Sequence, residues 1–137
     1  MLFRSPGFKS VEEILKGTPF QVVTPAQYKA RTKTGKVVGF FYESANVAGA
    51  DGWRAKNFKD AIDPKLGLTY LAIPRSASVP DTEYLSLELF TSPAYYLYHN
   101  GQKVFSAGGG DPNPSPEVFA KETEILKNNL RVLNGMK

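Results

Sequence analysis

The side chains that could carry out chemistry are few, and no thiol is among them. The chain of 137 residues has no cysteine and a single histidine. Without cysteine it offers no disulfide, no thiolate metal site and no cysteine nucleophile. His99 stands beside the turn sequence Asn100-Gly101, and the spacing supplies no partners for a triad or a metal site. We therefore interpret His99 as an exposed turn residue and expect no catalytic residue, no metal and no cofactor.

Carboxylates and small residues near position 50 give two weaker signals. Asp51, Asp60 and Asp63 are too sparse for a calcium loop, and Glu43 with Asp51 fits cap and surface charges better than an acid/base pair. Residues 44–52 (SANVAGADG) are small and lie between a strand and a helix, where backbone amides can hold an anion. The spacings of nucleotide-binding glycine loops are missing. We favour a loop that lets another surface approach closely.

Aromatic residues suggest binding or packing roles. Trp53 is the only tryptophan, and it could anchor a protein partner or pack a helix on the sheet. We favour packing. Tyr95, Tyr96 and Tyr98 alternate along a predicted strand, so Tyr96 and Tyr98 should share a face opposite Tyr95. Tyrosines on an open sheet can stack bases, but we expect these to fill core and interface.

Length and charge set the class of protein. A chain of 137 residues predicts one compact domain, and 12% aromatic residues argue against disorder. Residues 1–65 carry eleven Lys/Arg against six Asp/Glu, a net +5, whereas residues 66–137 carry six against seven, a net −1. A basic half could contact nucleic acid. Because the charges are dispersed, nucleic-acid binding is the weakest of the functions considered.

The start of the chain sets the expected compartment. Residues 1–6 (MLFRSP) contain no apolar signal segment. No stretch approaches the roughly 18 apolar residues of a membrane span. We therefore expect an intracellular, cytoplasmic protein that does not enter a membrane.

Capping signals and apolar periodicity predict the elements that would position a site. Ser10 with Glu13 predicts a short helix ending near Gly17, and Ser115-Pro116 opens a long helix to Asn134. Between them we predict strands at 20–23, 36–43 and 68–73, helices at 24–31 and 53–62, and a hairpin with strands 94–98 and 103–107 around Asn100-Gly101. Residues 83–90 fit a strand or a helix.

This order indicates an α/β plan with a mixed sheet, and it resembles the thioredoxin superfamily. Residues 92–104 (SPAYYLYHNGQKV) are similar to that family's cis-proline, strand, Asn-Gly turn and returning strand, and residues 37–44 (VVGFFYES) resemble the strand before its redox motif. The resemblance implies a thioredoxin-like three-layer α/β/α fold with a central mixed β-sheet and a C-terminal helix. We expect residues 1–19 to form an N-terminal extension with a short helix and residues 20–137 to form the thioredoxin-like domain.

The departures from the family pattern decide the expected function. Where the family has its two cysteines, this chain has Ala45-Asn46-Val47-Ala48, and Ser44 replaces the preceding tryptophan. The position of the family's buried acid falls at Gly39. Thiol–disulfide exchange needs a thiolate, so the sequence predicts a redox-inactive protein, not an enzyme.

We expect this protein to be a protein-binding or structural subunit of a larger assembly. The resemblance implies a cis Ser92–Pro93 peptide, and we predict that Ser92 and Pro93 form one partner surface with Ala45, Asn46, Val47 and Ala48. Trp53 is a further candidate contact. Two alternatives stay open: a glutathione- or nucleotide-binding enzyme that uses Ser92 and takes its thiol from the substrate, and a nucleic-acid-binding accessory protein.

Overall fold

The computed structural model describes residues 8–137, which form five strands and five helices. The strands are β1 (Gln21–Val22), β2 (Lys36–Tyr42), β3 (Thr69–Pro74), β4 (Ala94–His99) and β5 (Gln102–Gly108). The helices are α1 (Val11–Ile14), α2 (Pro25–Arg31), α3 (Ala50–Ala61), α4 (Asp81–Ser86) and α5 (Pro116–Gly135).

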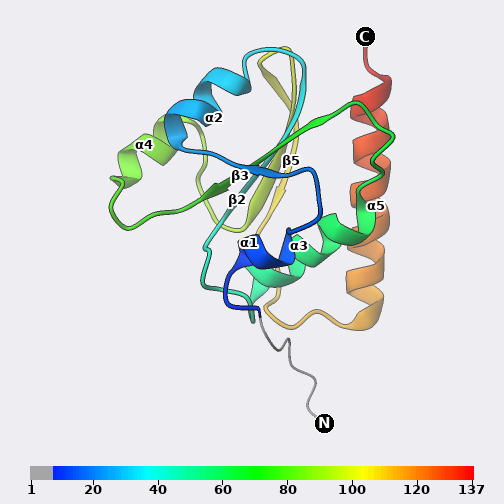
Figure 1. The fold of residues 1–137 in the computed structure, drawn as a ribbon. Coiled ribbons are helices and arrows are strands. Elements are labelled where there is room, and N and C mark those ends of the chain that lie inside the picture. The colour runs from blue at the N-terminus through cyan, green and yellow to red at the C-terminus, as the bar shows by residue number, and fades with distance from the viewer. Residues whose placement is uncertain (1–7) are drawn as a thin grey trace.

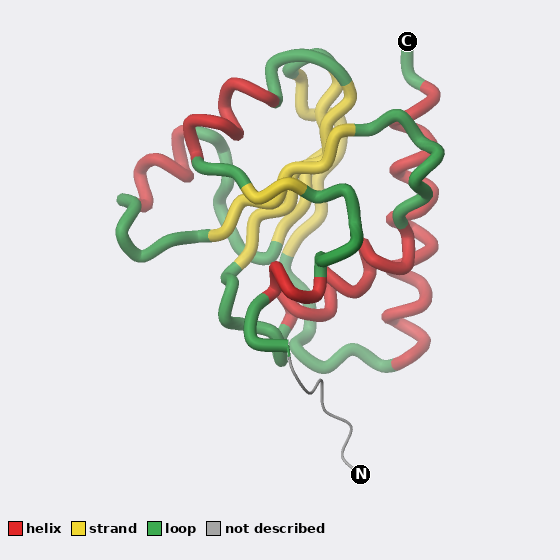
Figure 2. Tube along the Cα trace, in the orientation of Figure 1, coloured by secondary structure: helices red, strands yellow, loops and turns green. Residues whose placement is uncertain are grey.

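The strands form one mixed sheet in the order β1-β3-β2-β4-β5. The central strand β2 runs parallel to β3 and antiparallel to β4, and it is buried on both faces, as its apolar run predicts. Helices α2 and α4 cover one face, and α1, α3 and α5 cover the other (Figures 1 and 2). The predicted three-layer α/β/α fold with a C-terminal helix is confirmed.

Each face of the sheet has its own apolar core. Tyr95 and Leu97 of β4 belong to the core under α1, α3 and α5. Tyr96 and Tyr98 belong to the core under α2 and α4. The predicted alternation of these tyrosines is therefore confirmed, and both sets are buried in the described chain.

Local signals in the sequence fix the element ends. Thr24 forms a capping box with Gln27 at the start of α2, and Ser115 caps α5 through the Val118 N–H. Asn100 and Gly101 both have positive φ, 51° and 85°, as the predicted type I′ turn requires. The hairpin and its turn are confirmed.

The start of α3 differs from the prediction. The helix begins at Ala50 rather than near Trp53, so the end of the segment 44–52, which fits a loop or the start of a helix, supplies its first turn. Gly52 allows this, because a Cβ there would collide with the Val47 carbonyl. Residues 83–86 of the ambiguous segment 83–90 belong to the short helix α4, so the segment begins as a helix and not as a strand. Leu89, beyond the end of that helix, is buried in the core.

The described part of the predicted N-terminal extension shares the core of the domain. Val11, Ile14 and Leu15 are buried with residues of α3 and α5. Residues 1–6, on which the signal-segment prediction rests, lie outside the described part. Within residues 8–137, no helix has both the length and the apolar character needed to cross a bilayer.

Candidate functional site

The loop between β2 and α3, residues 43–49, is held in place by one buried carboxylate. Asp51, in the first turn of α3, accepts hydrogen bonds from the Glu43 N–H (2.7 Å) and from the Asn46 side-chain amide (2.6 Å). A carboxylate in the first turn of a helix is also favoured by the helix dipole. The loop is therefore fixed from the α3 side.

Helix α1 fixes the same loop from the other side. The Glu12 carboxylate accepts hydrogen bonds from the Tyr42 hydroxyl (2.8 Å) and from the Ser44 hydroxyl, and the Val11 N–H donates to the Ser44 carbonyl (2.8 Å). Burial pushes the pKa of Glu12 upward, but the hydrogen bonds from Ser44 and Tyr42 outweigh it, so the pKa lies below the usual glutamate value. Glu12 therefore binds the loop as a carboxylate.

The four residues at the predicted redox-motif positions lie in this fixed loop. Ala45, Asn46 and Ala48 are exposed, and Val47 is half-buried against the core under α3. None of these side chains can act as a nucleophile or as an acid. The loop therefore presents small side chains and one amide at the surface.

Tyr28 fills the place where the resemblance puts a buried acid. A Cβ on Gly39 would overlap the Tyr28 hydroxyl, and the Tyr28 ring carbon Cζ would lie 2.7 Å away. The Tyr28 and Tyr98 hydroxyls share a hydrogen bond of 2.7 Å. Burial raises the pKa of Tyr28 well above its usual value and that of Tyr98 to about 12. Both phenols therefore stay protonated at neutral pH and replace an ionisable group with a neutral pair.

The Ser92–Pro93 peptide is cis, so that prediction is confirmed. Phe41 pairs with Ala94 across antiparallel strands, which puts Pro93 at the sheet end where β2 leads into the 43–49 loop. Pro93 itself is buried, and its carbonyl accepts the Gly109 N–H (2.7 Å). That Pro93 and Ala45 share one surface remains a prediction.

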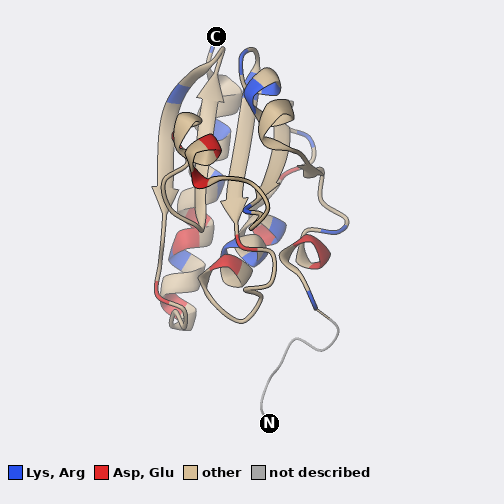
Figure 3. Cartoon of the chain, turned by 90° about the vertical axis from the view of Figure 1, so that its left-hand side faces the viewer, with Lys and Arg blue, Asp and Glu red and all other residues tan. Residues whose placement is uncertain are grey.

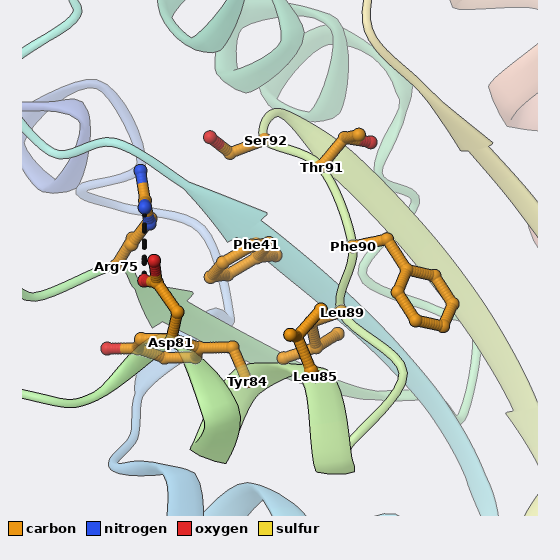
Figure 4. Close-up of a pocket in the computed structure, with 9 residues that line it drawn as sticks. All are labelled: Phe41, Arg75, Asp81, Tyr84, Leu85, Leu89, Phe90, Thr91 and Ser92. Atoms are coloured by element: carbon orange, nitrogen blue, oxygen red, sulfur yellow. Dashed lines mark hydrogen bonds and ion pairs between the residues drawn. The ribbon is translucent and has the colours of Figure 1, made fainter.

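A pocket of about 360 Å³ lies beside this proline (Figure 4). Phe41 lies in its middle, with α4 on one side and residues 89–92 on the other. Leu85 and Phe90 on its rim are 49% and 64% exposed. Thr91 and Ser92 add polar groups at the end nearest Pro93. The pocket thus mixes apolar and polar lining groups, and it has large exposed apolar side chains at its mouth.

Charged residues close the other end of the pocket. The Arg75 guanidinium binds the carboxylates of Glu43 (2.8 Å) and Asp81 (3.0 Å), and Arg75 and Asp81 also line an adjacent hollow of about 300 Å³. Hydrogen bonds to Glu43 and then to Asp81 raise the pKa of Arg75. Two carboxylates against one guanidinium give this end a net negative charge.

Trp53 is buried, so the structure does not place it as an exposed anchor. Its burial agrees with a packing role, and its printed contacts are with α5 and with the loop after β5. The indole N–H donates to the Asp111 carbonyl (2.7 Å), and the ring meets Phe119 of α5 at 6.2 Å between centroids. Gly110 lies against the ring, because a Cβ there would come within 2.7 Å of it. Trp53 thus supports the 108–111 loop, whose Gly109 binds Pro93.

Sequence reasoning missed Tyr28, Glu12 and the Arg75 cluster. A glycine inside an apolar strand signals close approach of another group, which could have pointed to a partner for Gly39. The cluster around Arg75 left no signal, because Glu43 lies 32 residues from Arg75 in the sequence. His99 is half-buried at the opposite end of β4 from Pro93, and among the described residues no group of acidic or histidine side chains could hold a metal ion.

Comparisons with known proteins bear on the fold. No family model and no curated protein matches this sequence. Among solved structures, the thioredoxin Mala s 13 of Malassezia sympodialis is similar with a TM-score of 0.61 at 18% identity, covering 86% of this chain and 96% of that one. Thioredoxin f2 of Chlamydomonas reinhardtii is similar with a TM-score of 0.56 at 14% identity, covering 80% of this chain and 94% of that one. Thioredoxin f of spinach chloroplast is similar with a TM-score of 0.56 at 13% identity, covering 88% of this chain and 93% of that one.

Proposed function

Starting from a thioredoxin fold with no cysteine, we propose that this chain is a non-catalytic, protein-binding subunit of a larger assembly. A fold by itself implies no chemistry, so function must be argued from the site. The proposed binding surface comprises Ser92, the loop Ala45–Ala48 and the mouth of the pocket at Leu85 and Phe90, and it lies beside the buried Pro93.

The observation that carries the proposal is the replacement of every reactive group by a fixed, neutral one. Thiol–disulfide exchange requires a thiolate that attacks sulfur, and the loop carries alanines at both positions. Tyr28 takes the space of the acid, and Asp51 and Glu12 hold the loop by hydrogen bonds. A rigid loop without chemistry favours recognition, because less entropy is lost when a preorganised surface binds.

The apolar mouth of the pocket supports a protein as the ligand. Exposed apolar side chains rimmed by polar groups mark interaction sites. Leu85 and Phe90 are such side chains, and Thr91 and Ser92 supply the polar rim. We infer that an extended segment of the partner places an apolar side chain in the pocket and pairs its backbone with Ser92.

The enzyme alternative is less well supported by the charges. Glutathione and nucleotides are anionic, whereas Glu43 and Asp81 flank the pocket and already occupy the guanidinium of Arg75. We expect no change in melting temperature with millimolar glutathione or ATP. A rise with either ligand would favour the enzyme, because binding to the native state stabilises it.

A photo-crosslinker placed at the pocket tests the proposal. The full chain carries the crosslinker at Thr91, and a matched variant carries it at Thr34, an exposed threonine in the turn after α2. In extract from the native source, we expect a discrete crosslinked protein from position 91 alone, and its loss when Phe90→Ala is added. Equal crosslinking at both positions would show that the pocket is not the binding site. Measurable reduction of insulin by the wild-type chain would contradict the non-catalytic assignment.

A further inference from the structure

The pocket beside Pro93 continues past the ion pair that closes one end of it. Arg75 and Asp81 line both this pocket, of about 360 Å³, and a second hollow of about 300 Å³. The ion pair between them (3.0 Å) is therefore a wall that the two cavities share. In Figure 4 it stands on the opposite side of Phe41 from Phe90. The two cavities together are here called the two-part groove.

The two parts of the groove differ in the side chains that line them. Large apolar side chains line the first part: Phe41, Leu85, Leu89 and Phe90. Two of these, Leu85 and Phe90, are exposed at its mouth. The second part has Glu43 and Ser76 beside the shared ion pair. The first part therefore suits an apolar side chain, and the second suits a polar or charged one.

Both carboxylates of the second part have capacity for another hydrogen bond. Glu43 binds Arg75 through Oε2, and Asp81 binds it through Oδ1. Within residues 8–137, no side chain bonds the remaining oxygen of either carboxylate. The side chains of Glu43 and Asp81 are 43% and 68% exposed. Because an ionised carboxylate has about four acceptor sites, each can accept a hydrogen bond from a cation of a bound partner.

Two further carboxylates add negative charge behind the second part. Asp51 accepts a hydrogen bond from the Glu43 N–H (2.7 Å), and Glu12 accepts one from the hydroxyl of Ser44, the next residue. The pKa of Glu12 lies below the usual glutamate value, so Glu12 is ionised at neutral pH. In this connected set, four carboxylates accompany a single guanidinium, that of Arg75. This local excess of negative charge attracts cations.

We propose that the partner segment at this site carries a basic side chain two residues away from its apolar one. In an extended segment, alternate side chains point to the same face and stand about 6–7 Å apart. The apolar side chain enters the first part of the groove, and the basic side chain enters the second part across the wall of Arg75 and Asp81. This inference rests on the proposed function, because it needs an extended segment that pairs with Ser92.

The charges of the second part select the class of side chain. Lys and Arg side chains carry only donors, and hydrogen bonds between ionised groups are stronger than those between neutral groups. An acidic side chain would instead oppose Glu43 and Asp81, and like charges across an interface disfavour association. The groove thus attracts one class of segment and repels another, which is how interfaces become specific.

Three peptides with blocked ends test the proposal on the full chain. Arg-Ser-Leu-Ser-Arg has a basic residue two positions from the leucine on both sides, so the direction of binding does not matter. Ser-Arg-Leu-Arg-Ser has the same composition with the wrong spacing, and Glu-Ser-Leu-Ser-Glu has the opposite charge. NMR titration measures each dissociation constant. We expect the first peptide to bind about fivefold more tightly than the second and at least about tenfold more tightly than the third.

Neutral variants of the two carboxylates test the role of charge. In the double variant Glu43→Gln/Asp81→Asn, Arg75 keeps its charge without these partners, so the preference should reverse toward Glu-Ser-Leu-Ser-Glu. Glu124→Gln is the matched control, because Glu124 also pairs with a cation, Lys127, and its side chain is 70% exposed against 68% for Asp81. The control should leave all three dissociation constants unchanged.

The outcomes separate this inference from the proposed function. A reversed preference in the double variant, shown to be folded by circular dichroism, supports the basic side chain. Equal binding of all three peptides, lost in Phe90→Ala, would overturn it and leave the pocket as a binding site. A preference that persists in the folded double variant, or that Glu124→Gln abolishes, also overturns it. Absence of binding by every peptide at millimolar concentration overturns it too, and the crosslinker at Thr91 then decides whether the site binds a protein.

Discussion

Gly39 and Tyr28 compete for the same space in the centre of the sheet. The Tyr28 hydroxyl stands where a side chain on residue 39 would begin, and it is held there by Tyr98. A strand glycine normally weakens a sheet, but here it makes room for a buried aromatic ring. The pair therefore couples the identity of a residue in β2 to that of a residue in α2.

This coupling predicts the effect of adding one methyl group. Gly39→Ala should destabilise the chain by about 1–3 kcal/mol, because its Cβ forces the Tyr28 ring to move in a packed core. Gly67→Ala is the control, since nothing lies within 4 Å of a Cβ there and φ is not in the left-handed region. Urea denaturation measures both. An equal loss of unfolding free energy at the two glycines would show that the Tyr28 ring can move aside at little cost.

At the scale of elements, α1 is joined to the loop through Glu12. The helix has only four residues, which is too short for it to be stable alone. Its stability must therefore come from packing and from the hydrogen bonds of Glu12. The pKa of Glu12 is lower in the folded chain than its usual value. Its stabilisation is therefore complete above the usual glutamate pKa and is lost as pH falls through the lower folded value.

The lowered pKa of Glu12 predicts a substitution whose effect on stability depends on pH. Glu12→Gln should lower the free energy of unfolding by about 1 kcal/mol at neutral pH, because an amide cannot accept both hydrogen bonds as strongly. The difference from wild type should shrink below about pH 4, where carboxylates become protonated. Urea denaturation at several pH values measures it, with exposed Glu124→Gln as the control. A difference in unfolding free energy that stays constant with pH would contradict the binding of the loop by an ionised Glu12.

Several elements were predictable because their signals are local. The capping box at Thr24 and the Asn100-Gly101 turn depend on neighbours in the sequence, and the structure has both. The exact start of α3 could not be predicted, because it depends on the hydrogen bonds that Asp51 accepts from the loop and on the close approach of Gly52 to Val47. The contact between Trp53 and Asp111 could not be predicted either, since the two residues are 58 positions apart.

At the scale of the whole molecule, charge is spread rather than gathered. In Figure 3, positions of Lys and Arg are interspersed with positions of Asp and Glu along the described ribbon. The order of elements along the chain followed from apolar runs, caps and turns, whereas the three layers were expected from the resemblance to a known family. The pocket did not, because residues of β2, β3 and α4 meet only in the folded chain.

The dispersed charge predicts weak interaction with nucleic acid. We expect no binding to mixed-sequence DNA or RNA at about 0.15 M salt, because affinity for the phosphate backbone requires several cations on one surface. Fluorescence anisotropy with labelled oligonucleotides measures this. Binding that weakens steeply as salt is raised would instead favour the accessory role in nucleic-acid binding.

The contact between Gly39 and Tyr28 also sets the order in which substitutions can accumulate. A larger residue 39 is accommodated more easily once residue 28 has become smaller, but a smaller residue 28 leaves the Tyr98 hydroxyl without its partner. Substitutions at residues 39 and 28 are therefore linked, and the order in which they occur decides which intermediate protein must fold.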